Sequence, residues 1–300
     1  MTDITASAGE AVHAAPRRQG RISGFCRAQP LGAIAAGLLL ILAFAALFAD
    51  WIAPYDPVAI DFASVLVAPS WVHPLGTDAF GRDILSRIIF GARTALAIGI
   101  LSSAFGSVLG ALIGVASAYF GGRVDLIVQR LVDVLLSFPI IVLALVVLAI
   151  LGRHPILGID INLVVAIAIP IIPKVSRVVR AAALSVREMP YIDAARAGGY
   201  GHGRIIFRHM VPNVTAPFLI MFTAFIAQAI LLEASLSFLG LGVNEPTAAW
   251  GLMLSGNASD FYREAPWIVI FPGLAISLAV FAFNLFGDAL RDWLDPKFKA

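Results

Sequence analysis

Charged residues are scarce in this chain. They make up 13% of its 300 residues, whereas hydrophobic residues make up 60%. A soluble domain has about a quarter charged residues and just under half apolar ones, so this composition excludes an ordinary soluble protein. The apolar residues form long uninterrupted runs rather than a strict alternation, which favours spanning helices over a β-barrel. We therefore predict an all-α membrane protein embedded in a lipid bilayer.

Cysteine and lysine are rarer still. Cys26 stands alone, so no internal disulfide forms, and no Cys/His cluster has the spacing of a metal site. Lysine occurs only at Lys174, Lys297 and Lys299, and none of these follows a glycine or precedes serine or threonine. A phosphate-binding loop needs that Gly-Lys-Ser/Thr arrangement. Because paired carboxylates and a Ser/His/Asp pattern are missing too, we predict no catalytic residue, no metal and no cofactor on this chain. The net charge of +2 gives no basis for a nucleic-acid partner.

Six apolar runs reach the roughly 20 residues that a membrane-spanning helix needs. The predicted spans are residues 31–51, 94–120, 124–151, 163–184, 214–239 and 267–285. Pro170 and Pro173 interrupt the fourth. Residues 1–30 are small, polar and basic, so we predict a disordered cytoplasmic tail there and a second tail at 291–300. Residues 94–290 are predicted to form a five-helix core.

The basic residues indicate the orientation in the membrane. Six spans place both termini on one side, and the positive-inside rule makes the side richer in arginine and lysine the cytoplasmic one. With both termini inside, the cytoplasmic segments hold Arg17, Arg18, Arg21, Arg27, Arg123, Arg187, Arg196, Arg204, Arg208, Arg291, Lys297 and Lys299. The outer segments hold Arg82, Arg87, Arg93, Arg153 and Arg263 among many carboxylates, and the first three of these arginines need a local explanation.

Residues 52–93 can account for these three arginines, because we predict them to be an extracytoplasmic loop with an amphipathic helix. Thr77 or Asp78 can cap a short helix there. Asp83 and Arg87 are four residues apart and can pair on its polar face. The helix is expected to lie along the outer membrane surface before the second span. It can serve either to close the bundle or to take part in gating.

Small residues recur at every fourth position of the second span. They are Ser102, Gly106, Gly110, Gly114 and Ala118. Such a stripe lets a second helix approach closely, because lipid offers no hydrophobic drive for helix association. We predict helix packing along this stripe, against a partner helix in this chain or in another.

A polar loop with several arginines separates the fourth and fifth spans. Residues 186–197 are compatible with a helix, and the glycines between 198 and 203 break it. Residues 204–210 suit a second short helix that ends before Pro212 and carries Arg204 and Arg208 on one face. We predict a helix–turn–helix elbow on the cytoplasmic face that contacts a partner in the aqueous phase. A plain solvated loop is the alternative.

This elbow resembles the EAA loop of permease subunits from bacterial ABC importers. The match comprises Asp193-Ala194-Ala195, then Gly199 after three intervening residues, and His209-Met210-Val211-Pro212. Asp193 replaces the family's leading glutamate, and His209 replaces an isoleucine, as is usual in one branch of the family. In that family the loop forms a coupling helix that docks in a groove of the ATPase. The resemblance thus implies a coupling loop at residues 186–212, with ATPase-coupling roles for Asp193, Ala194, Ala195, Gly199, Arg204, Arg208, His209 and Pro212.

Three further segments resemble the dipeptide/oligopeptide/nickel branch, and its C-type permease most closely. They are His73–Arg93, the pattern formed by Arg130, Asp133, Phe138 and Pro139, and Glu233–Gly242 followed by Trp250–Leu254. The resemblance implies a type I ABC importer permease in the bacterial inner membrane. It also implies a second homologous permease subunit, two ATPase subunits that carry ATP and Mg, and an extracytoplasmic solute-binding protein. Di- or oligopeptides are the expected solute, with nickel complexes and glutathione left open.

Glu233 and Gln228 in the fifth span are candidates for the substrate pathway. An acid within the membrane is costly unless it is paired or faces water. Glu233 therefore either lines the pathway or is a structural group bonded near Ser235 and Ser237, and Gln228 can instead bond a neighbouring helix.

Arg130 and Asp133 can pair with each other or with the coupling region, and Pro139 and Pro170 can kink their helices. Two rival functions remain on the sequence alone. A gradient-driven secondary transporter would have inverted repeats and acids at the midplane. A membrane scaffold would use the elbow to recruit a soluble partner without transport.

Overall fold

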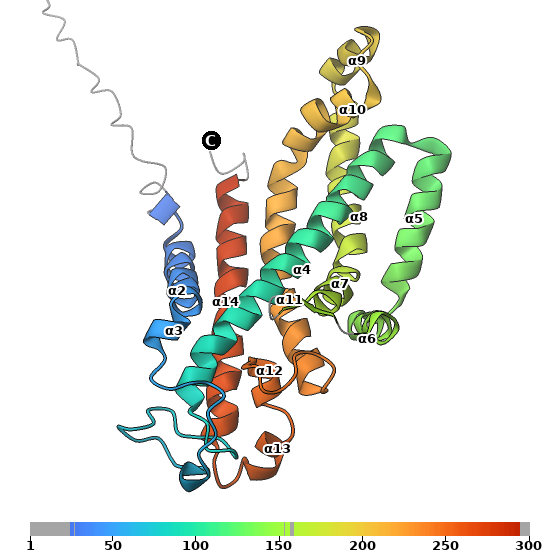
Figure 1. The fold of residues 1–300 in the computed structure, drawn as a ribbon. Coiled ribbons are helices and arrows are strands. Elements are labelled where there is room, and N and C mark those ends of the chain that lie inside the picture. The colour runs from blue at the N-terminus through green and yellow to red at the C-terminus, as the bar shows by residue number, and fades with distance from the viewer. Residues whose placement is uncertain (1–24, 27, 153, 157–158, 295–300) are drawn as a thin grey trace, which may run out of the picture.

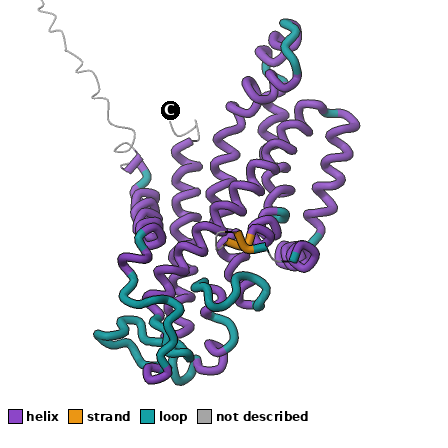
Figure 2. The backbone as a smooth tube through the Cα atoms, viewed as in Figure 1, coloured by secondary structure: helices purple, strands orange, loops and turns teal. Residues whose placement is uncertain are grey.

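The computed structural model describes residues 25–26, 28–152, 154–156 and 159–294. Within these residues the protein is a bundle of helices with one two-stranded sheet (Figures 1 and 2). Four helical stretches are long and apolar enough to cross a membrane, and two bent helix pairs raise the number to six. Most of the tail expected at residues 1–30 lies outside the described residues, as does the end of the second tail.

The first two spans are α2 (Pro30–Leu47), which is followed by the short α3 (Ala49–Ile52), and α4 (Ile84–Phe120). The loop between them holds a single 3₁₀ turn, η1 (Phe62–Ser64). The separate amphipathic helix expected before the second span is not present, because residues 84–93 form the first turns of α4. The cap is Asp83 rather than Thr77 or Asp78, and its carboxylate accepts from the Ser86 amide at 2.8 Å. No proline interrupts the helix between Ile84 and the predicted span.

The third and fourth spans are each broken at a proline. α5 (Gly122–Ser137) and α6 (Ile140–Leu151) meet at 98°, and α7 (Ile161–Ala168) and α8 (Ile171–Arg187) meet at 45°. Pro139 and Pro170 occupy the two breaks, where the missing amide and the restricted preceding residue disfavour a continuous helix. The kinks expected at Pro139 and Pro170 are therefore present, and the one at Pro139 is sharp enough to divide the third span into two helices. The strands β1 (Pro155–Ile156) and β2 (Ile159–Asp160) pair antiparallel between α6 and α7.

The elbow runs without a break into the fifth span. It contains α9 (Pro190–Ala197), α10 (His202–Ile205), the π-helical turn η2 (Ile206–Met210) and the 3₁₀ turn η3 (Val211–Val214), which leads into α11 (Thr215–Phe238). The second short helix does not end before Pro212 as expected. Pro212 stands at the start of η3, where a proline needs no amide partner, and the change of winding absorbs it.

The remaining elements are α12 (Trp250–Met253), α13 (Asn257–Phe261) and α14 (Trp267–Leu294). The last helix extends well beyond the predicted end of the sixth span. In Figure 1 the start of α2, the end of α14 and the α9–α10 elbow lie at one end of the bundle, the elbow end. The loop before α4, α12 and α13 lie at the other, the loop end.

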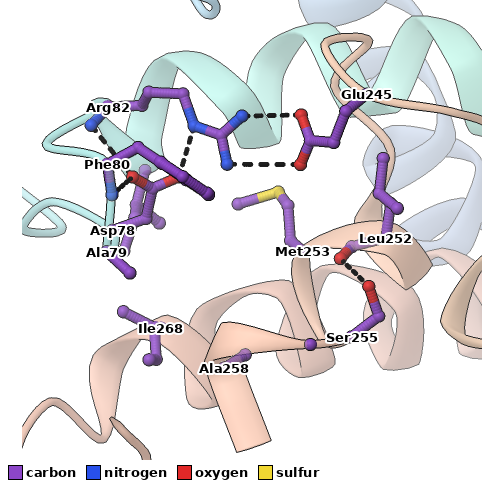
Figure 3. A pocket seen from close by; sticks show the side chains of 12 residues that line it. Asp78, Ala79, Phe80, Arg82, Glu245, Leu252, Met253, Ser255, Ala258 and Ile268 are labelled. Atoms are coloured by element: carbon purple, nitrogen blue, oxygen red, sulfur yellow. Dashed lines mark hydrogen bonds and ion pairs between the residues drawn. The ribbon is translucent and has the colours of Figure 1, made fainter. Parts of the chain in front are cut away.

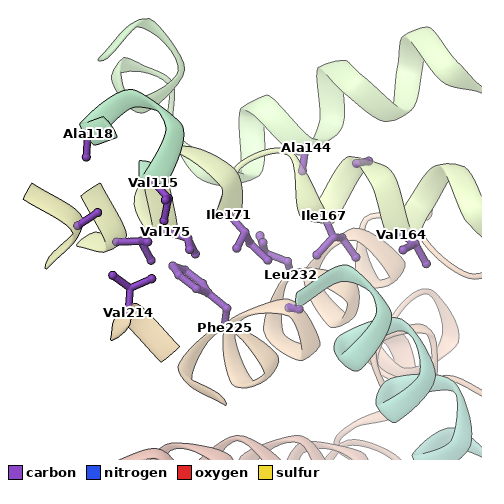
Figure 4. Close-up of a cluster of buried hydrophobic side chains, with 14 of the residues drawn as sticks. Val115, Ala118, Ala144, Val164, Ile167, Ile171, Val175, Val214, Phe225 and Leu232 are labelled. Atoms are coloured by element: carbon purple, nitrogen blue, oxygen red, sulfur yellow. The ribbon is translucent and has the colours of Figure 1, made fainter. Parts of the chain in front are cut away.

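The small-residue stripe of α4 packs against the α7–α8 pair of the same chain. A Cβ added at Gly106 would lie 2.8 Å from the Ala168 carbonyl oxygen, and one at Gly110 would lie 2.6 Å from that of Ile172. The predicted close packing is confirmed, and its partner lies within this chain. Beside it, α7, α8 and α11 bury the main apolar cluster, in which Figure 4 places Ile171 and Phe225.

Candidate functional site

The elbow is held to the bundle by a few buried apolar side chains while its polar side chains remain exposed. Ile192 and Ala195 of α9 are buried, whereas Asp193 and Ala194 are exposed. The Asp193 carboxylate is 72% exposed and pairs with Arg196 at 3.1 Å. The first half of the predicted coupling motif therefore presents its acid to the outside of this chain.

Gly199 makes the turn between the two halves of the elbow. Its φ is +75°, a conformation that glycine adopts without the strain other residues suffer. The Tyr200 amide donates to the Ala195 carbonyl at 3.1 Å and the Gly199 amide to that of Arg196 at 3.0 Å, which closes the end of α9. An added Cβ at Gly199 would meet no atom within 4 Å, so the backbone angle rather than the space requires glycine here.

The second half of the elbow carries a cationic and aromatic surface. The Arg204 guanidinium lies 4.3 Å from the centre of the Tyr200 ring, and that ring stacks on His209 with 6.3 Å between centroids. Phe207 and Arg208 are exposed, so this face offers groups that can bind a partner. The structure thus brings Arg204 and His209 together around Tyr200, which the motif did not single out, and leaves Arg208 and Pro212 exposed nearby.

A set of contacts that sequence reasoning missed ties the elbow to the end of α4. The Tyr119 hydroxyl and His202 Nδ1 are hydrogen-bonded at 2.8 Å, and Arg196 lies over the Tyr119 ring at 5.5 Å. Arg187 donates to the Ala118 carbonyl at 2.9 Å. Tyr119 and His202 are far apart in the chain and carry no shared motif, so only the packing of α4 on α8 reveals the pair.

Ion pairs join α5 to α8 below the elbow. Arg180 Nε donates to Asp125 at 2.6 Å, and Arg177 pairs with Asp133. Asp133 thus pairs with neither Arg130 nor the elbow, the two alternatives expected, because α8 lies alongside α5 and presents an arginine to it.

The two pathway candidates lie on α11. Glu233 is 1% exposed and accepts a hydrogen bond from Ser237 at 2.7 Å, while Ser237 accepts from the Val243 amide at 3.0 Å. This placement corresponds to the structural alternative for Glu233. Gln228 is partly exposed, and no hydrogen bond from its amide to another described residue is found. Its role in the pathway stays a prediction.

Arg82, Arg87 and Arg93, the three arginines that called for a local explanation, all have acidic partners. Arg82 donates to Asp78 at 2.6 Å and to Glu245 at 2.6 Å (Figure 3). Burial alone would lower the pKa of Arg82, but the hydrogen bond to Glu245 and the charge of Asp78 raise it above its usual value. Arg93 pairs with Asp50 at 2.8 Å and lowers the pKa of that carboxyl group. Local pairing therefore accounts for positive charges on this side.

The predicted pair between Asp83 and Arg87 is wrong. Asp83 caps α4 and lies 3.0 Å from His73 Nδ1. Arg87 is fully buried, donates to the Pro57 carbonyl at 2.9 Å and lies 3.7 Å from Glu245. The helix cap takes up the Asp83 carboxylate, so Arg87 finds its partners on other loops.

The bundle of spans with an exposed elbow between two of them defines a membrane permease subunit. The fold is similar to a chain in a structure of the MetNI methionine ABC transporter in inward-facing conformations. The TM-score is 0.53 at 19% identity, with 71% of this chain and 98% of the other covered. This likeness concerns the fold, and it agrees with the expected ABC importer permease architecture.

Residues 106–300 match the family described as the binding-protein-dependent transport system inner membrane component, and residues 26–69 match the N-terminal TM domain of oligopeptide transport permease C. The chain belongs to this family of inner membrane transport components. The di/tripeptide transport system permease of Pseudomonas aeruginosa is 43% identical over 87% of this chain and 86% of its own length. The glutathione transport system permease of Pectobacterium atrosepticum is 44% identical over 89% and 88%.

The chain is therefore a multi-pass inner membrane permease of an ABC importer that depends on a binding protein. It works with an ATPase that binds the ATP, and it is not itself an ATPase. This membership decides against the gradient-driven transporter and the scaffold without transport.

Proposed function

We propose that this chain forms one half of the translocation pathway of an importer for di- or oligopeptides. The other half would be a second homologous permease subunit, and two ATPase subunits would drive the pair. The substrate class is supported by relatives of nearly the same length, which are named as permeases for di/tripeptides and for glutathione. Glutathione, itself a small peptide, is the second candidate, and nickel complexes remain a further alternative.

The observation that carries the coupling mechanism is the elbow, which is anchored on one side and exposed on the other. The elbow exposes three arginines, Arg196, Arg204 and Arg208. The exposed acids of the same segment are two, Glu188 and Asp193, so the exposed surface is cationic overall. An acidic groove on the ATPase would complement this surface. When the ATPase subunits close on ATP, the docked elbow moves with them, and the unbroken helical stretch from His202 to Phe238 carries the motion into α11.

Substitutions in the elbow test this coupling in the complete complex reconstituted in liposomes with its binding protein. Asp193→Lys should uncouple ATP hydrolysis from peptide uptake, because it reverses the one acidic charge of the motif. Gly199→Ala should do so in part, because it places a Cβ in a left-handed conformation at a cost of about 1 kcal/mol. Gly203→Ala is the matched control, since a Cβ there meets no atom within 4 Å and its φ is not positive.

Uptake and ATPase rates are measured together for each variant. Normal coupling in both Asp193→Lys and Gly199→Ala would remove the elbow from the mechanism. A wild-type complex that hydrolyses ATP but moves neither dialanine nor glutathione would remove the proposed substrate class.

A further inference from the structure

A cavity of 560 Å³ opens at the loop end, away from the elbow. It lies between α4, residues 159–160 and residues 242–248, and we call it the outer cavity. Ile159 and Asp160 of β2 line the cavity, and Figure 2 places the strands near the middle of the bundle. Ligand pockets for small molecules measure about 300–1,000 Å³, and a di- or tripeptide falls in this range.

The lining of the outer cavity combines charges of both signs with apolar walls. Arg93 and Asp160 contribute charged groups, and Phe90, Ile98 and Val243 contribute apolar surface. Glu245 also borders the cavity, but both of its carboxylate oxygens receive hydrogen bonds from Arg82. Its charge is therefore already compensated.

Arg93 and Asp160 each retain an uncommitted polar atom. Arg93 Nε donates to the Ala46 carbonyl at 2.9 Å and Nη2 to Asp50 at 2.8 Å, which leaves Nη1 with no hydrogen-bond partner among the described residues. Asp160 caps α7 through Oδ1, which accepts from the Asn162 amide at 3.0 Å. Across the described part of the chain, Oδ2 accepts no hydrogen bond. One cavity thus offers a free cationic donor and a free anionic acceptor.

We propose that the outer cavity receives a short peptide by its two charged ends. Arg93 Nη1 donates to the terminal carboxylate, and Asp160 Oδ2 accepts from the terminal ammonium. Charge-assisted bonds of this kind are the strong ones, and they recognise the main chain that all peptides share. The apolar walls accept side chains of different shapes. The proposal rests on the proposed peptide transport and adds the chemistry by which this subunit itself would hold the solute.

Other ligand classes fit this lining less well. A metal ion needs several oxygen or nitrogen ligands in one place, and no group of three His, Cys, Asp or Glu side chains able to hold one is found in the described residues. The charge of Arg93 is balanced by Asp50, but a neutral sugar would leave the Asp160 carboxylate without a cationic partner. The ammonium of a zwitterion compensates Asp160, and its carboxylate accepts from Arg93 Nη1.

Equilibrium binding of radiolabelled dialanine to the purified permease–ATPase complex, without binding protein, tests the site. Arg93→Gln and Asp160→Asn should each weaken binding about tenfold or more, because each removes a hydrogen bond to a charged group. Asparagine also caps a helix well, so Asp160→Asn preserves the start of α7. Dialanine amide, which lacks the terminal carboxylate, should compete for the wild-type site about tenfold less well than unlabelled dialanine does. In Arg93→Gln the two competitors should be equally weak. N-acetyl dialanine, which lacks the terminal ammonium, should likewise be the weaker competitor in the wild type and equal to dialanine in Asp160→Asn.

Asp50→Asn provides the control for a purely structural role of Arg93. It removes the ion pair that ties α3 to α4 while leaving the cavity lining intact. Binding that is unchanged in Asp50→Asn supports the site, and a loss equal to that of Arg93→Gln overturns it. Wild-type binding of dialanine by Arg93→Gln and Asp160→Asn would overturn the proposed site as well.

Uptake with the binding protein separates this proposal from the proposed function. If the wild-type complex imports dialanine while Arg93→Gln and Asp160→Asn bind and import it normally, the site fails and the function stands. If the wild-type complex binds dialanine at this site but never imports it, the proposed function fails instead.

Discussion

A single hydroxyl group fixes the loop that follows α11. Ser237 is fully buried, donates to Glu233 and accepts from the Val243 amide, so one oxygen satisfies a buried carboxylate and a partly buried amide. Buried polar groups that lose their partner retain the full cost of their desolvation. The hydrogen bond from Ser237 thereby helps this subunit to tolerate an acid within the membrane.

Ser237→Ala should lower the free energy of unfolding by about 1–3 kcal/mol, because it leaves both Glu233 and the Val243 amide without a partner. Ser235→Ala is the matched control two residues earlier. Ser235 donates only to the Leu231 carbonyl of its own helix, at 2.7 Å, and is partly exposed. Thermal unfolding of the detergent-solubilised protein measures both, and equal shifts in the two variants would contradict this account.

At the scale of the element, α4 packs closely on α8 because glycines at the contact have no side chain. The carbonyl oxygens of α8 approach the glycines of α4 so closely that a side chain at Gly110 would meet backbone, which cannot move aside cheaply. Gly110→Leu should therefore destabilise the bundle by about 1–3 kcal/mol or more. Gly37→Leu in α2 is the control, because an added Cβ there meets no atom within 4 Å and leucine favours a helix over glycine.

The folded yield and the unfolding temperature of the two glycine variants give the readout. A loss in Gly110→Leu with an unchanged or higher unfolding temperature in Gly37→Leu is expected. Similar behaviour of the two would mean that the α4–α8 contact is looser than the distances indicate.

The elements also show what hydropathy and spacing can predict. Periodic small residues and apolar runs report what a helix buries, so the spans and the stripe were predictable. The 98° turn at Pro139 was not, because a proline signals a break but its angle depends on what packs on either side. Asp133 likewise shows that spacing names possible partners within a helix, while the choice of Arg177 depends on the neighbouring helix.

In the candidate site, too, some features could be predicted from the sequence and others could not. The positive φ of Gly199 agrees with its place in the coupling motif, since a helix end of this type calls for glycine. The bond between Tyr119 and His202 and the outer cavity both join segments distant in sequence. Such pairs follow from the path of α4 through the bundle, which no local pattern encodes.

At the scale of the whole molecule, the two ends of the bundle should face opposite sides of the membrane. Cys26→Ser removes the only cysteine and gives a background for single labels. Arg123→Cys, exposed where α5 begins at the elbow end, should react with a membrane-impermeant maleimide only in inverted vesicles. Trp71→Cys, fully exposed in the loop before α4, should react only in right-side-out vesicles. Labelling of both from one side would refute the orientation.

The uninterrupted course of α4 gives the two ends a mechanical connection. Its 37 residues make a rod about 55 Å long, which contacts His202 of the elbow through Tyr119 and contributes Arg93 to the outer cavity. Its glycines are seated closely at several points along this rod, Gly91 and Gly99 against Trp250 and Ile230 as well as Gly110 against α8. A helix held in this way moves as one body with its neighbours, so a displacement delivered at the elbow end would reach the wall of the outer cavity at the same moment.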